Sequence, residues 1–159
     1  MQNIEMDKLQ YKIYHENKTH TPDDFPYNTY LCSIPLDFQS VNLHWHDEVE
    51  IIVIKKGIGI VSVDLTTYSV SAGDIIFVLP GQLHSISQKD NEIMEYENIL
   101  FKSSLLKSSG CDLCNDKFIQ PLFSGSLHIC PVINNQTPYY PPVITAINEI
   151  DHLCDLRPY

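Results

Sequence analysis

Three histidines and one glutamate stand at spacings that could bring them to a single metal ion. Two of the histidines lie in the stretch His44-Trp45-His46-Asp47-Glu48-Val49-Glu50. Since side chains alternate along a strand, His44 and His46 point to the same face. Glu50 has the same parity, but on a straight strand it would lie ~13 Å beyond His46 at about 3.3 Å per residue. The chain must therefore turn near Asp47-Glu48, so that Glu50 opens the next strand beside the histidines.

The fourth candidate, His84, closes a second block that begins at Gly73. This block predicts a buried strand at residues 74–79, a turn at Pro80-Gly81 and a new strand that starts near His84. Three histidines and one carboxylate suit Zn(II), Ni(II), Mn(II) or Fe(II), with positions left open for water or a ligand. Asp47 and Glu48 are expected to face solvent, and we assign no catalytic role to them.

The elements that must position these residues are short strands. Up to about residue 102, β-branched and aromatic residues dominate runs that are broken by Gly, Asn, Asp or Pro. Many short strands without a helix signal between them predict an antiparallel sandwich or a closed barrel. The predicted strands are residues 11–14, 30–36, 41–45, 50–55, 58–64, 68–70, 74–79, 85–88 and 93–101.

Beyond residue 102 the pattern becomes helical, with short helices predicted at residues 103–107 and 112–122. A longer helix is predicted after Pro141-Pro142, because Val143, Ile147 and Ile150 recur at three- and four-residue spacing. Its apolar stripe needs a partner, and we expect the chain to be a fragment of a longer protein. The expected organisation is an N-terminal segment at residues 1–28, a barrel at 29–101 and a helical segment at 102–159.

The composition excludes several kinds of protein. Ten Lys and Arg against 20 Asp and Glu give a net charge of −10 over 159 residues, the wrong sign for a surface that binds nucleic acid by itself. No stretch approaches a membrane span and the N-terminus lacks the order of a signal peptide, so we expect a cytoplasmic protein with no membrane partner. The five cysteines are expected to be reduced, and a zinc site at Cys111 and Cys114 lacks a second matching pair.

The two blocks, which cover about residues 43–88, resemble the two conserved motifs of the cupin superfamily. The first matches at every defining position. The second keeps the spacing from Gly73 to His84 and the inner Gly81, but Leu79 stands where proline is usual and Gln88 where asparagine is usual. The resemblance implies a mainly β fold, a double-stranded β-helix (jelly-roll) barrel. It implies that the metal ligands are His44, His46, Glu50 and His84.

The wider chain resembles the N-terminal domain of AraC-type transcription regulators. The features that carry this are the Pro-Gly-x-x-His end of the second block, the stretch Glu97-Asn98-Ile99-Leu100-Phe101 and the helix that contains Ile147 and Leu153. The resemblance implies a barrel that senses a small molecule, often a sugar, and helices through which two copies form a homodimer. It also implies that DNA is bound only by a C-terminal helix-turn-helix domain, which this chain does not contain.

Two alternatives remain at this stage. The four residues could hold a divalent transition metal, or they could be hydrogen-bonding residues of a barrel that has lost its metal. A complete ligand set is also compatible with a stand-alone metal-dependent cupin enzyme, such as a dioxygenase or a sugar isomerase. We expect a sensing domain rather than an enzyme, because the AraC-like pattern extends beyond the two motifs.

Overall fold

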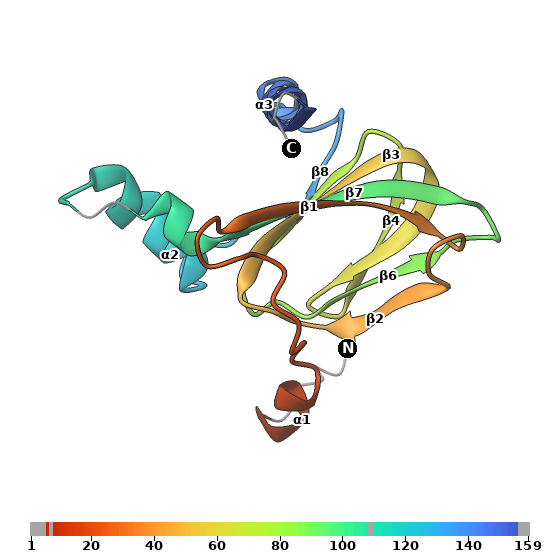
Figure 1. Cartoon of the computed structure of the whole chain (residues 1–159), viewed down its shortest axis with the longest axis horizontal. Helices are drawn as coiled ribbons and strands as arrows, with labels where there is room; N and C mark the ends of the chain where they lie inside the picture. The colour runs from red at the N-terminus through yellow and green to blue at the C-terminus, as the bar shows by residue number, and fades with distance from the viewer. Residues whose placement is uncertain (1–5, 7, 108–109, 156–159) are drawn as a thin grey trace.

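The computed structural model describes residues 6, 8–107 and 110–155, and of residues 154 and 155 only the backbone. Eight strands form the body of the molecule and helices lie before and after them (Figure 1). The strands are β1 (Tyr27–Ile34), β2 (Ser40–His44), β3 (Glu48–Val63), β4 (Thr66–Ser71), β5 (Ile75–Val78), β6 (His84–Gln88), β7 (Met94–Lys102) and β8 (Val132–Ile133). The α-helices are α1 (Lys8–Ile13), α2 (Gln120–Phe123) and α3 (Tyr140–Asp155).

The strands form two antiparallel sheets that share β3. In the first sheet the order is β1-β7-β3-β5-β8, and in the second β6 lies between β2 and β3 while β4 pairs with the other edge of β3. The N-terminal half of β3 pairs with β5 and β7, and its C-terminal half pairs with β4 and β6. A single long strand therefore joins both sheets into one barrel.

β3 passes from one sheet to the other at a bulge. The sequence predicts two strands there, at residues 50–55 and 58–64, whereas the structure has one strand of 16 residues. The register against β7 shifts between Ile54 and Lys56, and Gly57 follows with a positive φ of 76°. A Cβ at Gly57 would lie 1.8 Å from the Ile93 carbonyl oxygen, so glycine is required where β7 approaches. The glycine bends the strand instead of ending it, which explains the wrong prediction.

The space between the sheets is filled by apolar side chains that alternate along the strands. Ile52, Ile54, Ile76, Val78 and Ile86 are each at most 1% exposed and belong to this core. A second apolar cluster lies on the outer face of the first sheet, where Ile147 of α3 packs with residues of β3, β5, β7 and β8. The sheet is therefore covered on both faces, and the strands that line the barrel also carry α3.

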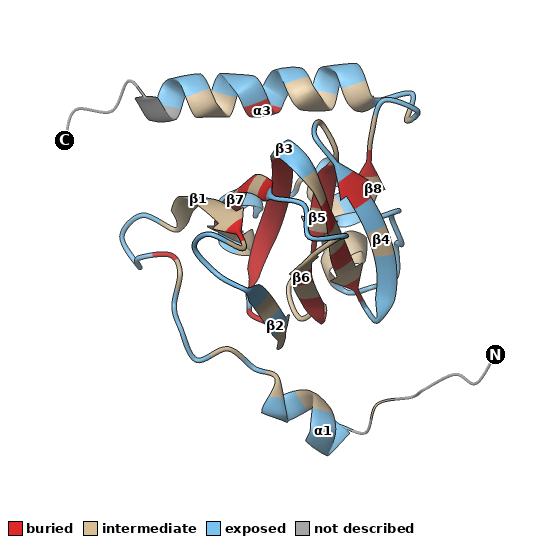
Figure 2. Ribbon diagram, turned by 90° about the vertical axis from the view of Figure 1, so that its right-hand side faces the viewer, coloured by how far each residue is buried: buried red, intermediate tan, exposed pale blue. Residues whose placement is uncertain are grey.

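Helix α3 lies across the barrel on the side opposite to α1 (Figures 1 and 2). Ile147 is 3% exposed, and the Tyr140 hydroxyl donates to the Gly73 carbonyl oxygen at 2.8 Å. Lys55 Nζ lies 2.7 Å from Asp151 Oδ2 and 2.8 Å from Glu97 Oε2. Burial lowers the pKa of Lys55, but the hydrogen bonds and charges of the two carboxylates outweigh burial and raise the pKa above its usual range.

The other helical predictions are only partly matched. The stretch 103–107 contains a 3₁₀ turn at Ser103–Leu106, and 112–122 contains a π-helical turn at Asn115–Ile119 that continues into α2. The strand predicted at residues 11–14 is wrong, because α1 occupies Lys8–Ile13. Instead, the backbone pairs just after it, through an isolated bridge between His15 and Trp45. The N-terminal residues thus contact the end of β2 without becoming a strand of either sheet.

Candidate functional site

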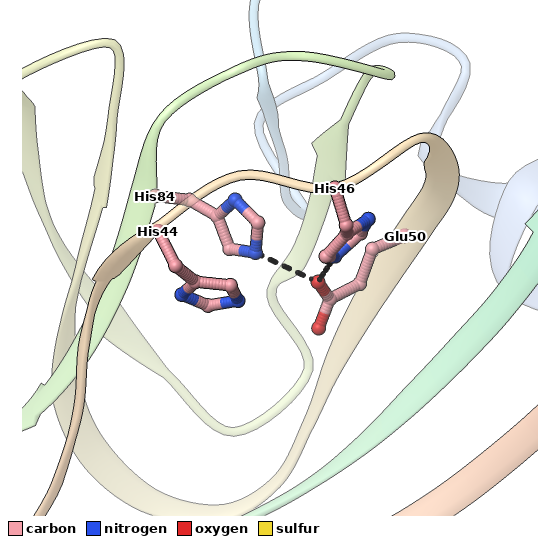
Figure 3. Close-up of side chains that lie close together, drawn as sticks. All are labelled: His44, His46, Glu50 and His84. Carbon is pink, nitrogen blue, oxygen red and sulfur yellow. Dashed lines mark hydrogen bonds and ion pairs between the residues drawn. The ribbon is translucent and has the colours of Figure 1, made fainter. Parts of the chain in front are cut away.

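The four predicted residues are brought together at one end of the barrel (Figure 3). His44 ends β2 and is paired in register with His84, which begins β6. His46 lies in the connection after β2, and Glu50 is the third residue of β3. The predicted turn is present, because β3 begins at Glu48 and returns beside the histidines. Each of the four residues offers one ligand atom, and these atoms all lie within 4.8 Å of one another.

The Glu50 carboxylate is the centre of this cluster. Its Oε2 atom lies 3.0 Å from His46 Nε2 and 2.9 Å from His84 Nε2, the two contacts that are dashed in Figure 3. The side chains of His46, Glu50 and His84 are at most 4% exposed, and that of His44 is 18% exposed. Buried charges of this kind must be paired or coordinate a metal, and this cluster can do either.

The histidine orientations fit a metal ion. The Nδ1 atoms of His44 and His84 lie 2.8 and 2.9 Å from the backbone oxygens of Asn42 and Gln82, so Nδ1 carries the proton and donates it to the backbone. The Nε2 atom of each ring therefore faces the cluster, where a neutral imidazole can offer its lone pair to a metal, as in metal-ligating histidines. His46 Nδ1 lies 3.6 Å from Glu48 Oε2, a carboxylate on the outer side of the ring. The donor set therefore fits a divalent transition metal.

The electrostatics agree with the geometry. Burial raises the pKa of Glu50, but hydrogen bonds and charge from His46 and His84 outweigh it and hold the pKa well below its usual range. Burial lowers the pKa of His46, whereas its hydrogen bond to Glu50 and the charge of that carboxylate raise the pKa overall. Burial and the neighbouring His84 lower the pKa of His44. Glu50 is thus ionised and His44 neutral, which are the forms that bind a metal, whereas the raised pKa of His46 favours its protonated form, so that a metal would displace a proton from this ring.

A cavity of about 280 Å³ opens beside the cluster in the barrel interior. His44, His46 and Glu50 line it on one side, and apolar residues such as Val41, Phe38 and Leu100 line another. Tyr96 and Asn98 of β7 also face it. Burial raises the pKa of the fully buried Tyr96, whose hydroxyl interacts with the Cys32 thiol. Among the described residues, the buried Asn98 Oδ1 atom has no hydrogen-bond partner. Buried polar atoms of this kind indicate that the cavity is built to receive a polar ligand.

Sequence reasoning missed the residues that the N-terminal part adds to this site. His20 lines the cavity and stacks edge-on against His46, with ring centroids 5.5 Å apart. Glu48 was expected to face solvent and is instead buried, where it accepts hydrogen bonds from the backbone of His20 and the hydroxyl of Thr21. Asp47 is exposed as expected. No periodicity in residues 14–26 signals these contacts.

The cysteines do not contribute to a second cluster. Cys32 lines the cavity, while Cys111, Cys114 and Cys130 are exposed, and all four are free thiols. Over residues 6, 8–107 and 110–153, the histidine and glutamate cluster is the one group whose ligand atoms are close enough to hold a metal. In the same part of the chain, no helix has the length and apolar character needed to cross a membrane.

Comparison with known proteins places this site in a family. The profile of the AraC-like ligand binding domain matches residues 33–132, which is more than half of the chain. The chain belongs to the AraC-like ligand-binding domain family. The matched region contains β2 to β7 in full, the last two residues of β1, the first residue of β8 and all four residues of the cluster. The family and the two-sheet barrel confirm the prediction of a mainly β cupin barrel followed by a helix.

Individual relatives are distant. The uncharacterized HTH-type transcriptional regulator YdeC of Bacillus subtilis is 25% identical over 136 residues, which cover 84% of this chain. The chain spans 45% of the length of that regulator. A cupin protein from Bacteroides fragilis is 22% identical with a TM-score of 0.47, over 55% of this chain and 78% of its own. A cupin 2 conserved barrel domain protein from Salinispora arenicola is 21% identical with a TM-score of 0.45, over 51% and 67% of the two chains.

Proposed function

We propose that this chain is the effector-sensing and dimerisation part of an AraC-type transcription regulator. The observation that carries the proposal is a buried histidine and glutamate cluster beside a cavity inside an AraC-like ligand-binding domain. Residues 1–28 act as an arm, residues 29–101 as the sensing barrel and residues 102–159 as the segment through which two copies pair. DNA is bound by a region outside this chain, since an acidic chain with a net charge of −10 repels phosphates.

The effector is a small polar molecule, with a sugar as the class to test first. A cavity of about 280 Å³ has room for a molecule near the lower end of the size range of ligand pockets. Its apolar wall, the Tyr96 hydroxyl and the side-chain carbonyl of Asn98, which has no hydrogen-bond partner among the described residues, suit a molecule with apolar faces and hydroxyl groups.

A divalent transition metal is the cofactor we propose, held by His44, His46, Glu50 and His84. When bound, the ion would offer open coordination positions to an oxygen of the effector. The chain's own residues orient the ligands: Gln82 and Asn42 fix two imidazoles through their backbone oxygens, and Glu48 faces the third. Zn, Ni, Mn and Fe are all compatible with this donor set.

Elemental analysis of the purified chain tests the metal site. The wild type is expected to carry close to one equivalent of metal, because the four ligand atoms are already within reach of one ion. His46→Ala is expected to lose it, whereas His128→Ala, at an exposed histidine far from the cluster in sequence, keeps it. If neither the wild type nor the control contains metal after growth with zinc, nickel, manganese and iron, the proposal of a metal site is overturned, and the four residues are polar groups of the pocket.

Thermal unfolding with L-arabinose, D-xylose, D-glucose and D-galactose tests the effector class. A sugar present at 100 times its Kd should stabilise the fold by about 2.7 kcal/mol. For a domain of this size that corresponds to a rise in Tm of roughly 5–10 °C. Asn98→Leu, which removes a polar group of the cavity, should abolish the rise. A panel in which no sugar moves the Tm of the metal-loaded wild type would refute the sugar class.

A metal-dependent cupin enzyme is the second candidate, and the complete ligand set is the observation that favours it. The two candidates differ in what they do to a bound molecule. A dioxygenase loaded with iron should consume oxygen when a substrate is added, and an isomerase should convert an added sugar, which NMR of the mixture would detect. A sensor returns the sugar unchanged and shows only the rise in Tm.

A further inference from the structure

The N-terminal segment, defined here as residues 8–21, is fixed in register beside the cluster. The backbone N–H of Trp45 donates to the Tyr14 oxygen at 3.0 Å, and that of Glu16 donates to the Trp45 oxygen at 2.9 Å. Trp45 stands between His44 and His46, so these two hydrogen bonds hold Glu16 next to both histidines. The position of Glu16 is therefore determined by the strand that carries the cluster.

The Glu16 carboxylate approaches the cluster from the side of the N-terminal segment. Its Oε2 atom lies 2.8 Å from His20 Nε2 and 3.6 Å from His44 Nε2, while Glu50 contacts His46 and His84 from within β3. Two carboxylates thus converge on four imidazoles. Among the described residues, no lysine or arginine forms an ion pair with Glu16 or Glu50. Lys18 also lines the cavity, but its ammonium lies over the Tyr30 ring, so the charges in direct contact with the two carboxylates come from the histidines or from a bound cation.

The other contacts of the N-terminal segment with the barrel are mainly polar or aromatic, and they include a hydrogen bond from the Trp45 indole to the Tyr11 oxygen at 2.8 Å and the packing of His15 on the Trp45 ring. Helix α1 has no buried residue. Tyr11 stacks on Trp45 with ring centroids 4.7 Å apart and its hydroxyl contacts the Gly81 carbonyl oxygen, while Thr21 is buried beside Glu48. A segment with so little buried apolar surface opens at low cost in free energy, and a single additional interaction can change how often it is docked.

We propose that a divalent metal in the cluster clamps the N-terminal segment to the barrel through Glu16, so that docking of this segment responds to the metal. The proposal rests on the metal site proposed above. With neutral imidazoles, the ionised Glu50 compensates one charge of a divalent ion, and two outer carboxylates can compensate the other: Glu48, which faces His46 from β3, and Glu16, which faces His44 from the N-terminal segment. Of these two carboxylates, Glu16 is the one whose contribution depends on docking of the N-terminal segment.

The coupling must be reciprocal. If metal binding increases the equilibrium constant for docking of the segment by some factor, docking increases the metal affinity by the same factor. Loss of an outer carboxylate at a metal site lowers metal affinity by about 10–100-fold. The same factor is therefore expected in the equilibrium constant for docking of the segment. Substitutions in the segment far from the metal should also weaken metal binding.

The experiment uses Zn²⁺ as the probe and the N-terminal segment as the readout. Tryptic cleavage at Lys8, Lys12 and Lys18 reports opening, and acrylamide quenching of Trp45, the single tryptophan, reports loss of the Tyr11 stack. In chelator-treated wild type, saturating Zn²⁺ should slow cleavage at these lysines about 10-fold or more and reduce quenching. Glu16→Gln should bind one Zn²⁺ with about 10–100-fold lower affinity and show neither change at saturation. Glu92→Gln, at an exposed glutamate, should behave as the wild type.

Three outcomes separate the possibilities. Stoichiometric Zn²⁺ binding by the wild type without any change in cleavage or quenching would overturn the clamp and leave the metal site standing. Protection of Glu16→Gln equal to that of the wild type would also overturn it. Failure of the wild type to bind Zn²⁺ would overturn both the metal site and the clamp. A third variant, Tyr11→Ala, guards against misfolding of Glu16→Gln. It leaves every candidate ligand intact and should still lower the Zn²⁺ affinity several-fold.

Discussion

Replacing Ile147 by alanine should detach helix α3 from the barrel. Ile147 is 3% exposed and packs against Ile51, Val53, Ile75 and Ile99 on the outer face of the first sheet. The substitution removes three buried carbon atoms, worth about 0.8 kcal/mol each. The cavity left behind adds to this, which gives a loss of about 2–5 kcal/mol in the free energy of unfolding. For a chain of this length the Tm should fall by roughly 5–15 °C.

The same helix supplies the control. Leu153 is 64% exposed, so Leu153→Ala should change the free energy of unfolding by less than about 0.5 kcal/mol. Urea denaturation of both variants gives the two free energies, and hydrogen exchange shows where the loss falls. In Ile147→Ala the amides of α3 should exchange faster while those of β3 and β7 keep more of their protection. Equal effects of the two substitutions, or unchanged exchange in α3, would refute the view that one isoleucine anchors the helix.

Three further results are expected. Gly57→Ala should fail to fold or lose several kcal/mol in the free energy of unfolding, because its Cβ would overlap a backbone oxygen. Gly125 has a similar φ but lies in open space, so Gly125→Ala should express normally, and circular dichroism distinguishes the two variants. The raised pKa of Lys55 means that its contribution is complete below pH ~10.4 and is lost as the pH rises through the higher folded value. The urea midpoints of the wild type and Lys55→Met should therefore differ at neutral pH and converge above pH ~10.4. Glu48→Gln should keep the metal bound to His46 but weaken it about 10-fold, measured by competition with a chelator, because the outer carboxylate is lost.

The sequence predicted that His44, His46, Glu50 and His84 lie close together, because their placement depends on local rules. Alternation puts His44 and His46 on one face, and the turn after His46 is needed before Glu50 can approach them. His84 is placed by its pairing with His44, a register that the order of the two blocks already suggests. Apart from the closure of the barrel, no contact between distant segments has to be known to place these four residues.

What the sequence did not predict depends on contacts between distant segments. Glu16 and His20 reach the site because the backbone N–H and oxygen of Trp45 form hydrogen bonds with Tyr14 and Glu16 of the N-terminal segment. No local sequence pattern signals this pairing. The aromatic residues near Tyr11 suggested a strand, but stacking on Trp45 is satisfied from a helix. The short strand β8 was missed because its two residues, Val132 and Ile133, pair with β5 after a long excursion. In each case a partner far along the chain decides the conformation.

Strand β7 carries two separate sets of residues on its two faces. Tyr96, Asn98 and Leu100 face the cavity, whereas Glu97 and Ile99 face α3. Because neighbours along a strand point to opposite sides, substitutions on one face leave the other largely intact. A lineage could therefore acquire a different effector by changing the even-numbered positions while the odd-numbered ones preserve the helix contact. The same division gives a protein engineer a strand whose cavity face can be redesigned without rebuilding its contact with α3.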